Sequence, residues 1–280
     1  MTDDFSGYKA HVLARIAESA IDKQPFYHLC VADILPQRLY TALAATARGI
    51  EREAAGMPVP SNPRRTEHFR DMLGTRRDAD VDLLYRLFSD HEIKTSLLER
   101  FYQENTGHLA GLLTLDHVRF GFTTSPPEGY TEVHLDVPPK YLSFVFYFPG
   151  ENVETPDQGM NGTVLYDASL TPHYKVPFKA NSGFVFAPHF HSYHAYLPTI
   201  RRTAFVMSYA RRRDNVLWRL VERARCDRPP FFVFKWMVQR KLTAHPLKEY
   251  GSDAKAVSRA RAACLVDGAT GRVFAPGAAP

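Results

Sequence analysis

The hydrophobic positions of the first part of the chain follow a helical spacing. Over roughly the first hundred residues this spacing predicts one helix over 37–50, ending near Gly49, and two more helices over 78–103. A short run from Phe26 to Val31 is aromatic and β-branched, which predicts a strand between helices. The N-terminal hundred residues should therefore be mainly helical.

The segment between the predicted helices, residues 51–77, lacks the helical spacing of hydrophobic positions. Residues 51–77 are polar and contain prolines, which predicts a long loop that could cover a site, with a mobile surface insertion as the alternative. We assign residues 1–115 to a helical N-terminal region that includes this loop.

From Asp116 onward the pattern changes to short aromatic and β-branched runs separated by Pro, Gly and Asn. We predict strands over residues 116–122, 130–137, 141–148, 162–167, 173–178, 182–188, 192–197 and 202–210. Antiparallel strands at this spacing favour a double-sheet jelly roll, also called a double-stranded β-helix.

The whole chain is expected to form one domain of the α+β class. The jelly-roll core would span residues 116–210, flanked by the helical N-terminal region (residues 1–115) and a C-terminal helical extension over 211–280. The flanking helices should pack on one sheet and leave the other end of the barrel open.

Composition and charge narrow the classes of function. With 45% hydrophobic and 23% charged residues, the chain has the balance of a soluble globular protein. No apolar run approaches the roughly 18 residues of a membrane span, and the acidic N-terminus does not resemble a signal peptide, so we expect a cytoplasmic protein without membrane contact. The 3 cysteines are too few and too widely spaced for a disulfide framework.

The formal net charge of +5 does not by itself indicate nucleic-acid binding. Its excess of arginine lies in residues 211–228, where apolar positions at helical spacing place most of the arginines on the opposite, solvated face. No nucleic-acid-binding motif accompanies them, so we expect a small-molecule substrate rather than nucleic acid. The sequence does not predict an oligomeric state.

Candidate metal ligands occur on two predicted strands. His134 and Asp136 stand two residues apart, so a strand would point both side chains to one face. Such a pair occurs by chance about once in a chain of this composition. A second imidazole, His194, lies on a later strand, and two imidazoles with one carboxylate leave three positions open on Fe(II). A structural zinc site would be closed and usually rich in thiolates.

The order of these residues resembles a known family. His-x-Asp, a distal His and then a basic residue, here Arg202, are similar to the Fe(II)/2-oxoglutarate dioxygenases of the double-stranded β-helix type, especially the prolyl-hydroxylase branch. The resemblance covers about residues 116–209. It implies that His134, Asp136 and His194 hold Fe(II), and that Arg202 binds the distal carboxylate of 2-oxoglutarate.

The same resemblance extends to the strand after the first two ligands. YLSFVFYFP is similar to the family strand on which a hydroxyl residue and a later Tyr line the cosubstrate pocket, and these positions fall on Ser143 and Tyr147. Strand alternation independently puts Ser143, Val145 and Tyr147 on one face.

Other histidines and arginines compete for two of these roles. His189 and His191 crowd the distal position, but His194 has the family's Ser-aromatic-His context, which leaves the other two as loop residues that could line the mouth of the site. Arg201 and Arg202 are adjacent and should point to opposite faces of a strand, so only one reaches the cosubstrate. The family's small residue two positions after the arginine favours Arg202.

Three residues are candidates for contact with a substrate. Lys140 and Tyr141 follow His-x-Asp closely, and His191 precedes the distal ligand. For Lys140 a solvated position at the end of a loop is an alternative, and for His191 an exposed or hydrogen-bonded structural role.

The family resemblance implies an oxygenase that uses Fe(II), 2-oxoglutarate and O2. It would hydroxylate an unactivated C–H bond while 2-oxoglutarate is decarboxylated to succinate and CO2. We expect a small biosynthetic metabolite as the substrate, such as an amino acid, a sugar or a carrier-bound intermediate. A peptidyl or protein hydroxylase and a cupin-like metal-binding barrel that does not use 2-oxoglutarate stay open as alternatives.

Overall fold

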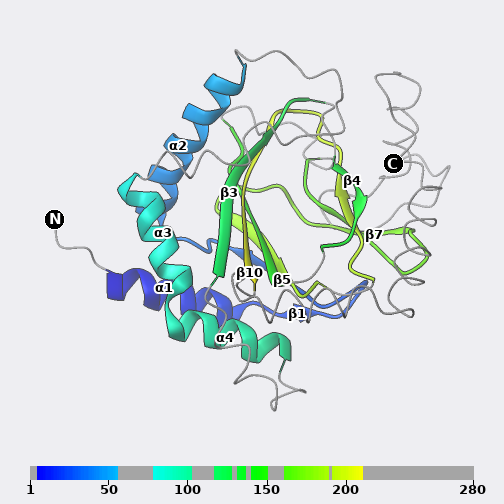
Figure 1. The fold of residues 1–280 in the computed structure, drawn as a ribbon, viewed down its shortest axis with the longest axis horizontal. Helices are drawn as coiled ribbons and strands as arrows, with labels where there is room; N and C mark the ends of the chain where they lie inside the picture. The colour runs from blue at the N-terminus through cyan, green and yellow to red at the C-terminus, as the bar shows by residue number, and fades with distance from the viewer. Residues whose placement is uncertain are drawn as a thin grey trace, which may run out of the picture.

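Helices come first and strands follow in this chain (Figure 1). The computed structural model describes residues 5–55, 78–102, 117–127, 131–136, 140–150, 161–188 and 191–210. The helices are α1 (Phe5–Glu18), α2 (Gln37–Ala55), α3 (Ala79–Ser89) and α4 (His91–Tyr102). The strands are β1 (Ile21–Asp22), β2 (His28–Ala32), β3 (His117–Ser125), β4 (Thr131–His134), β5 (Lys140–Tyr147), β6 (Val164–Tyr166), β7 (Pro172–Lys175), β8 (Ser182–Phe186), β9 (His194–Tyr196) and β10 (Arg202–Ala210).

The strands form two antiparallel sheets. The larger has six strands in the order β1-β2-β8-β5-β10-β3, and the smaller has four in the order β4-β9-β6-β7. From β3 to β10 the chain passes back and forth between them, so neighbours along the chain, such as β4 and β5, lie in different sheets. Strands distant in sequence therefore become neighbours, which brings β4 beside β9.

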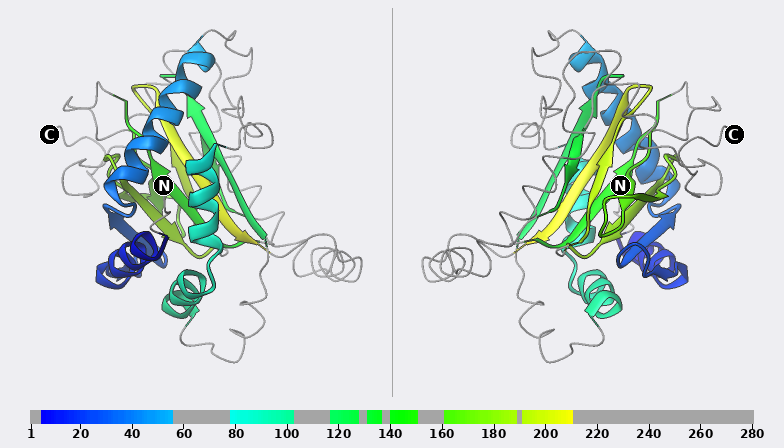
Figure 2. Two further views of the ribbon diagram at one scale, coloured as in Figure 1. Left: turned by 90° about the vertical axis from the view of Figure 1, so that its left-hand side faces the viewer. Right: turned by 90° about the vertical axis from the view of Figure 1, so that its right-hand side faces the viewer.

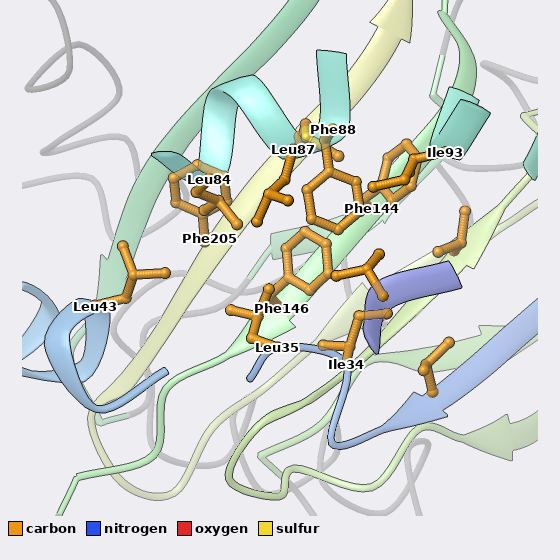
Figure 3. Close-up of a cluster of buried hydrophobic side chains, with 14 of the residues drawn as sticks. Ile34, Leu35, Leu43, Leu84, Leu87, Phe88, Ile93, Phe144, Phe146 and Phe205 are labelled. Carbon is orange, nitrogen blue, oxygen red and sulfur yellow. The ribbon is translucent and has the colours of Figure 1, made fainter. Parts of the chain in front are cut away.

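The helices cover one face of the larger sheet, and the smaller sheet lies on its other side (Figures 1 and 2). Every second side chain of β5 points toward the helices and contacts them. Phe144, Phe146 and Phe148 are buried with apolar side chains of the helices, and Phe88 of α3 packs 5.2 Å from the ring of Phe146 (Figure 3). One face of β5 therefore packs against the helices.

Val145 and Tyr147 of the same strand point the other way, into a second buried cluster. This cluster includes Leu165 of β6 and Phe184 of β8, so it takes side chains from both sheets and lies between them. The cluster between the two sheets is thus separate from the core that faces the helices.

Most of the predicted elements are confirmed. Every predicted strand from residue 116 onward has its counterpart, as do the early strand (β2) and the helix pair α3 and α4. The predicted end near Gly49 is wrong: α2 continues to Ala55, because Ile50 is buried at 2% exposure and good helix formers follow it. The start of the predicted loop 51–77 is therefore helical.

Several predictions concern residues that lie outside the described segments of the chain. Residues 56–77 of the loop, 103–116 and the expected C-terminal helices of 211–280 lie outside the described residues. No helix within the described segments is long and apolar enough to span a membrane.

Candidate metal centre

Two imidazoles meet across neighbouring strands of the smaller sheet. His134 ends β4 and His194 begins β9, and the antiparallel register places them directly opposite each other. Their ring centroids are 4.2 Å apart. Side chains of directly opposed residues share one face of a sheet, so both rings project to the same side.

Asp136 completes the cluster from a position just beyond β4. The strand was predicted to run to residue 137, but it ends at His134. The ligand atoms of His134, Asp136 and His194 nevertheless lie within 4.8 Å of one another. No other group of this kind occurs among the residues that the structure describes.

The orientation of His194 suits metal binding. Its Nδ1 lies 2.9 Å from the carbonyl oxygen of Ser192, and donation there leaves Nε2 with its lone pair for a metal. Burial, with the adjacent ring of His134, lowers the pKa of His194 to about 3 against the opposing effect of Asp136. The ring is therefore neutral at physiological pH, which is the form that binds a metal.

The carboxylate of Asp136 is held by two neighbours. Lys140 Nζ donates to Oδ1 at 2.6 Å, and the hydroxyl of Ser143 donates to Oδ2. Burial favours the protonated acid, but Lys140, His194 and His134 outweigh it and hold the pKa of this carboxyl well below its usual range. Asp136 is thus ionised and fixed in orientation.

This donor set fits a divalent transition metal. Two neutral imidazoles and one carboxylate are the ligands of non-haem Fe(II) sites that keep open positions. The hydrogen bonds that His194 makes with Ser192, and Asp136 with its two donors, are of the kind that orients metal ligands.

A buried cation, Arg202, lies against Tyr196 of β9, the strand that also carries His194. Arg202 begins β10 and is 2% exposed. Its Nε donates to the carbonyl of Asn161 at 3.1 Å and its Nη2 to Thr163 Oγ1 at 3.3 Å. Within the described ranges it forms no ion pair. A buried guanidinium is costly unless it is hydrogen-bonded and paired with an anion.

Tyr147 lies beside Arg202, with its ring centroid 5.3 Å from the guanidinium carbon. Its hydroxyl donates to Thr163 Oγ1 at 2.8 Å and accepts from Thr163 N at 3.1 Å. Burial raises the pKa of Tyr147 although Arg202 and Thr163 oppose this, so the hydroxyl stays protonated. The structure thus brings Tyr147 and Arg202 together, as the family resemblance implies.

The other candidate residues, Ser143, Lys140 and Tyr141, differ in what their side chains contact. Ser143 faces the space between the two sheets, and its hydroxyl donates a hydrogen bond to Asp136. Lys140 joins the cluster through the same carboxylate. The ring of Tyr141 packs against the helix-facing core and its carbonyl accepts a bond from Tyr102, so its contact with a substrate stays a prediction. A register shift between β5 and β10 at this point breaks the alternation that would have placed this ring on the face of Ser143.

His191 lies outside the group of three ligands. It is exposed, and its ring centroid is 6.4 Å from that of Tyr193. His189, the other competitor for the distal position, is not among the described residues.

Sequence reasoning missed three residues that surround Arg202. Asn161 and Thr163 accept its hydrogen bonds, and Tyr196 places its ring centroid 3.9 Å from the guanidinium carbon. Strand alternation could have found two of them, because Thr163 shares a face with Leu165 and Tyr196 shares one with His194. Asn161 lies outside any strand and carries no such signal.

Comparisons with known proteins identify only structural neighbours. No family model and no curated protein matches the sequence. A prolyl-4-hydroxylase from Pseudomonas putida is similar at 21% identity and a TM-score of 0.49, covering 73% of this chain and 99% of that one.

Two further neighbours have lower identity. A prolyl hydroxylase from Trichoplax adhaerens, solved with a peptide fragment of the hypoxia-inducible factor oxygen degradation domain, is 12% identical with a TM-score of 0.49, over 74% of this chain and 90% of that one. The non-haem α-ketoglutarate-dependent epimerase SnoN from nogalamycin biosynthesis is 13% identical with a TM-score of 0.40, over 76% and 88%. Two of these neighbours are prolyl hydroxylases, and the third is a non-haem α-ketoglutarate-dependent epimerase.

Proposed function

We propose that this chain is an Fe(II)- and 2-oxoglutarate-dependent oxygenase built on a jelly roll, and that it hydroxylates an unactivated C–H bond of a small metabolite. The observation that carries the proposal is the cluster of His134, Asp136 and His194 within 4.8 Å. The strand order of the two sheets, with the chain alternating between them, supports the jelly roll.

In this proposal the three clustered side chains hold Fe(II). Ser192 keeps His194 in the tautomer whose Nε2 faces the metal, while Ser143 and Lys140 keep the Asp136 carboxylate ionised and oriented. Three facing ligands leave positions for a bidentate cosubstrate and for O2. The bound iron and 2-oxoglutarate would supply the oxidising chemistry, in which 2-oxoglutarate and O2 give succinate and CO2 while one oxygen atom enters the substrate C–H bond.

The distal carboxylate of 2-oxoglutarate would bind Arg202. This pairing supplies the anion that a guanidinium at 2% exposure requires. Tyr196 lies against the guanidinium and stands two residues after His194, roughly 6.7 Å along an extended strand. The strand therefore brings this ring and a proposed metal ligand to the same face.

Turnover of 2-oxoglutarate tests this proposal. Anaerobically Fe(II)-loaded protein, then given O2, should form succinate, and the rate should rise with one class among amino acids, sugars, nucleosides and carrier-bound acyl groups. The His134→Ala variant should form none. Stimulation only by proline-containing peptides would favour the peptidyl hydroxylase. Tight metal binding without any consumption of 2-oxoglutarate would favour the cupin-like alternative.

A further inference from the structure

Two aromatic rings lie beside the guanidinium of Arg202, at unequal distances. The ring centroid of Tyr196 is 3.9 Å from Cζ, whereas that of Tyr147 is 5.3 Å away. The shorter distance is that of direct van der Waals contact, and a guanidinium against an aromatic face is attracted by the ring. Tyr196 is therefore the ring in closer contact with Arg202.

Tyr196 is itself fixed at both ends. Its backbone belongs to β9 of the smaller sheet, two residues after His194, so the two side chains share a face. Its hydroxyl lies 3.0 Å from Ser125 Oγ, at the end of β3 in the larger sheet. The side chain thus spans from one sheet to the other, and one strand presents both a metal-ligand candidate and this ring.

The edge of the guanidinium is only partly used. Of its five N–H bonds, Nε donates to Asn161 and Nη2 to Thr163. The N–H bonds that remain lie in the plane of the guanidinium, so an anion meets them in that plane, which is the geometry of bidentate carboxylate binding. The contacts with Asn161, Thr163 and Tyr196 together determine the direction of that approach.

We propose that Tyr196 is a positioning residue, which holds Arg202 for in-plane recognition of the distal carboxylate and thereby makes the site selective for a 2-oxo diacid over a 2-oxo monoacid. The inference rests on the proposed function, since it concerns the same cosubstrate site. It assigns to Tyr196 a role that acts through Arg202 and not through the metal.

Binding selectivity tests this role without any turnover. The full chain is loaded with Mn(II), and isothermal titration calorimetry measures the dissociation constants of 2-oxoglutarate and of 2-oxovalerate, which has the same length but no distal carboxylate. The wild type should prefer 2-oxoglutarate. Tyr196→Met, which keeps the bulk but removes the ring, should weaken 2-oxoglutarate by about tenfold or more, the scale of a desolvated cation–π contact, and leave 2-oxovalerate unchanged.

Two further variants make the comparison specific. Tyr196→Phe loses the hydrogen bond with Ser125 but retains the ring, so it should keep the preference within about threefold of wild type. Tyr85→Met changes an exposed tyrosine of α3 and should change neither constant. If circular dichroism shows that Tyr196→Met does not fold, Tyr196→Gln provides the same loss of the ring.

The outcomes separate this inference from the proposed function. A wild type that prefers 2-oxoglutarate, with a Tyr196→Met variant that keeps the preference or weakens both ligands equally, overturns the role of Tyr196 alone. A wild type without the preference overturns the proposed function together with it.

Discussion

The hydroxyl of Ser143 donates a hydrogen bond to Oδ2 of Asp136, which ties β5 of the larger sheet to the metal-ligand end of the smaller one. Ser143 is 2% exposed, so this bond is shielded from water. A carboxylate restrained in this way keeps its second oxygen directed toward its other partners.

Removing that hydroxyl should weaken metal binding without abolishing it. Ser143→Ala should raise the dissociation constant for Mn(II) by about 10- to 100-fold, the usual effect of losing a residue that orients a metal ligand. Calorimetric titration of the chelator-treated protein measures it. Ser143→Thr keeps a hydroxyl and is the matched control; equal affinity of Ser143→Ala and wild type would show that the bond does not orient Asp136.

Replacing a proposed ligand should remove the metal site itself. His134→Ala and Asp136→Ala each leave two of the three clustered donors, so neither should retain stoichiometric Fe(II) after gel filtration, as measured by elemental analysis. His91→Ala changes an exposed histidine of α4 and should retain it. Stoichiometric iron in either ligand variant would contradict the assignment.

Substitutions of the two adjacent arginines, Arg201 and Arg202, should differ in their effect on the affinity for 2-oxoglutarate. Arg202→Met should weaken 2-oxoglutarate by about 1.5–3 kcal/mol, the range for a hydrogen bond to a charged group. Arg201→Met should leave the affinity near that of wild type, because Arg201 precedes β10 and lies on its other face. The Michaelis constant for 2-oxoglutarate in both variants decides between them, and a change confined to Arg201→Met would reverse the roles.

Stability should depend on pH through His28, a buried histidine of β2 outside the metal cluster. Burial lowers its pKa below 6.5, while its bond to the carbonyl of Phe26 partly opposes this. The unfolded chain binds this proton below about pH 6.5 and the folded chain resists it, so the contribution is present above pH 6.5 and is lost as the pH falls.

Thermal denaturation of the chelator-treated protein between pH 7.5 and pH 5 tests this dependence. The melting temperature of wild type should fall with pH more steeply than that of His28→Gln. His91→Gln changes an exposed histidine of α4 and should behave like wild type. Parallel curves for wild type and His28→Gln would contradict the role of His28.

The strands were predictable because their alternation is strong. On β5 each Phe faces the helices and the intervening residues face the second sheet, as the period of two requires. The end of α2 was not predictable from Gly49, because burial of Ile50 outweighs the weak helix propensity of one glycine.

All three clustered side chains were predicted from the sequence, but strand geometry accounts for only two of them. His134 and His194 meet through strand register, but Asp136 lies beyond the end of β4 and reaches the cluster through an irregular segment. Tyr141 shows the limit of alternation, since a register shift turns it toward the helices. Non-local contacts such as that of Tyr196 with Arg202 depend on the packing of two sheets, which strand patterns do not specify.

The most direct test of the central claim is an anaerobic absorption titration of the Fe(II)-loaded protein with 2-oxoglutarate. Chelation of iron by the keto acid should produce a visible charge-transfer band that saturates at one equivalent per chain, is missing in Asp136→Ala and requires higher 2-oxoglutarate concentrations in Arg202→Met. An Fe(II)-loaded wild type whose spectrum does not change with 2-oxoglutarate would contradict the claim.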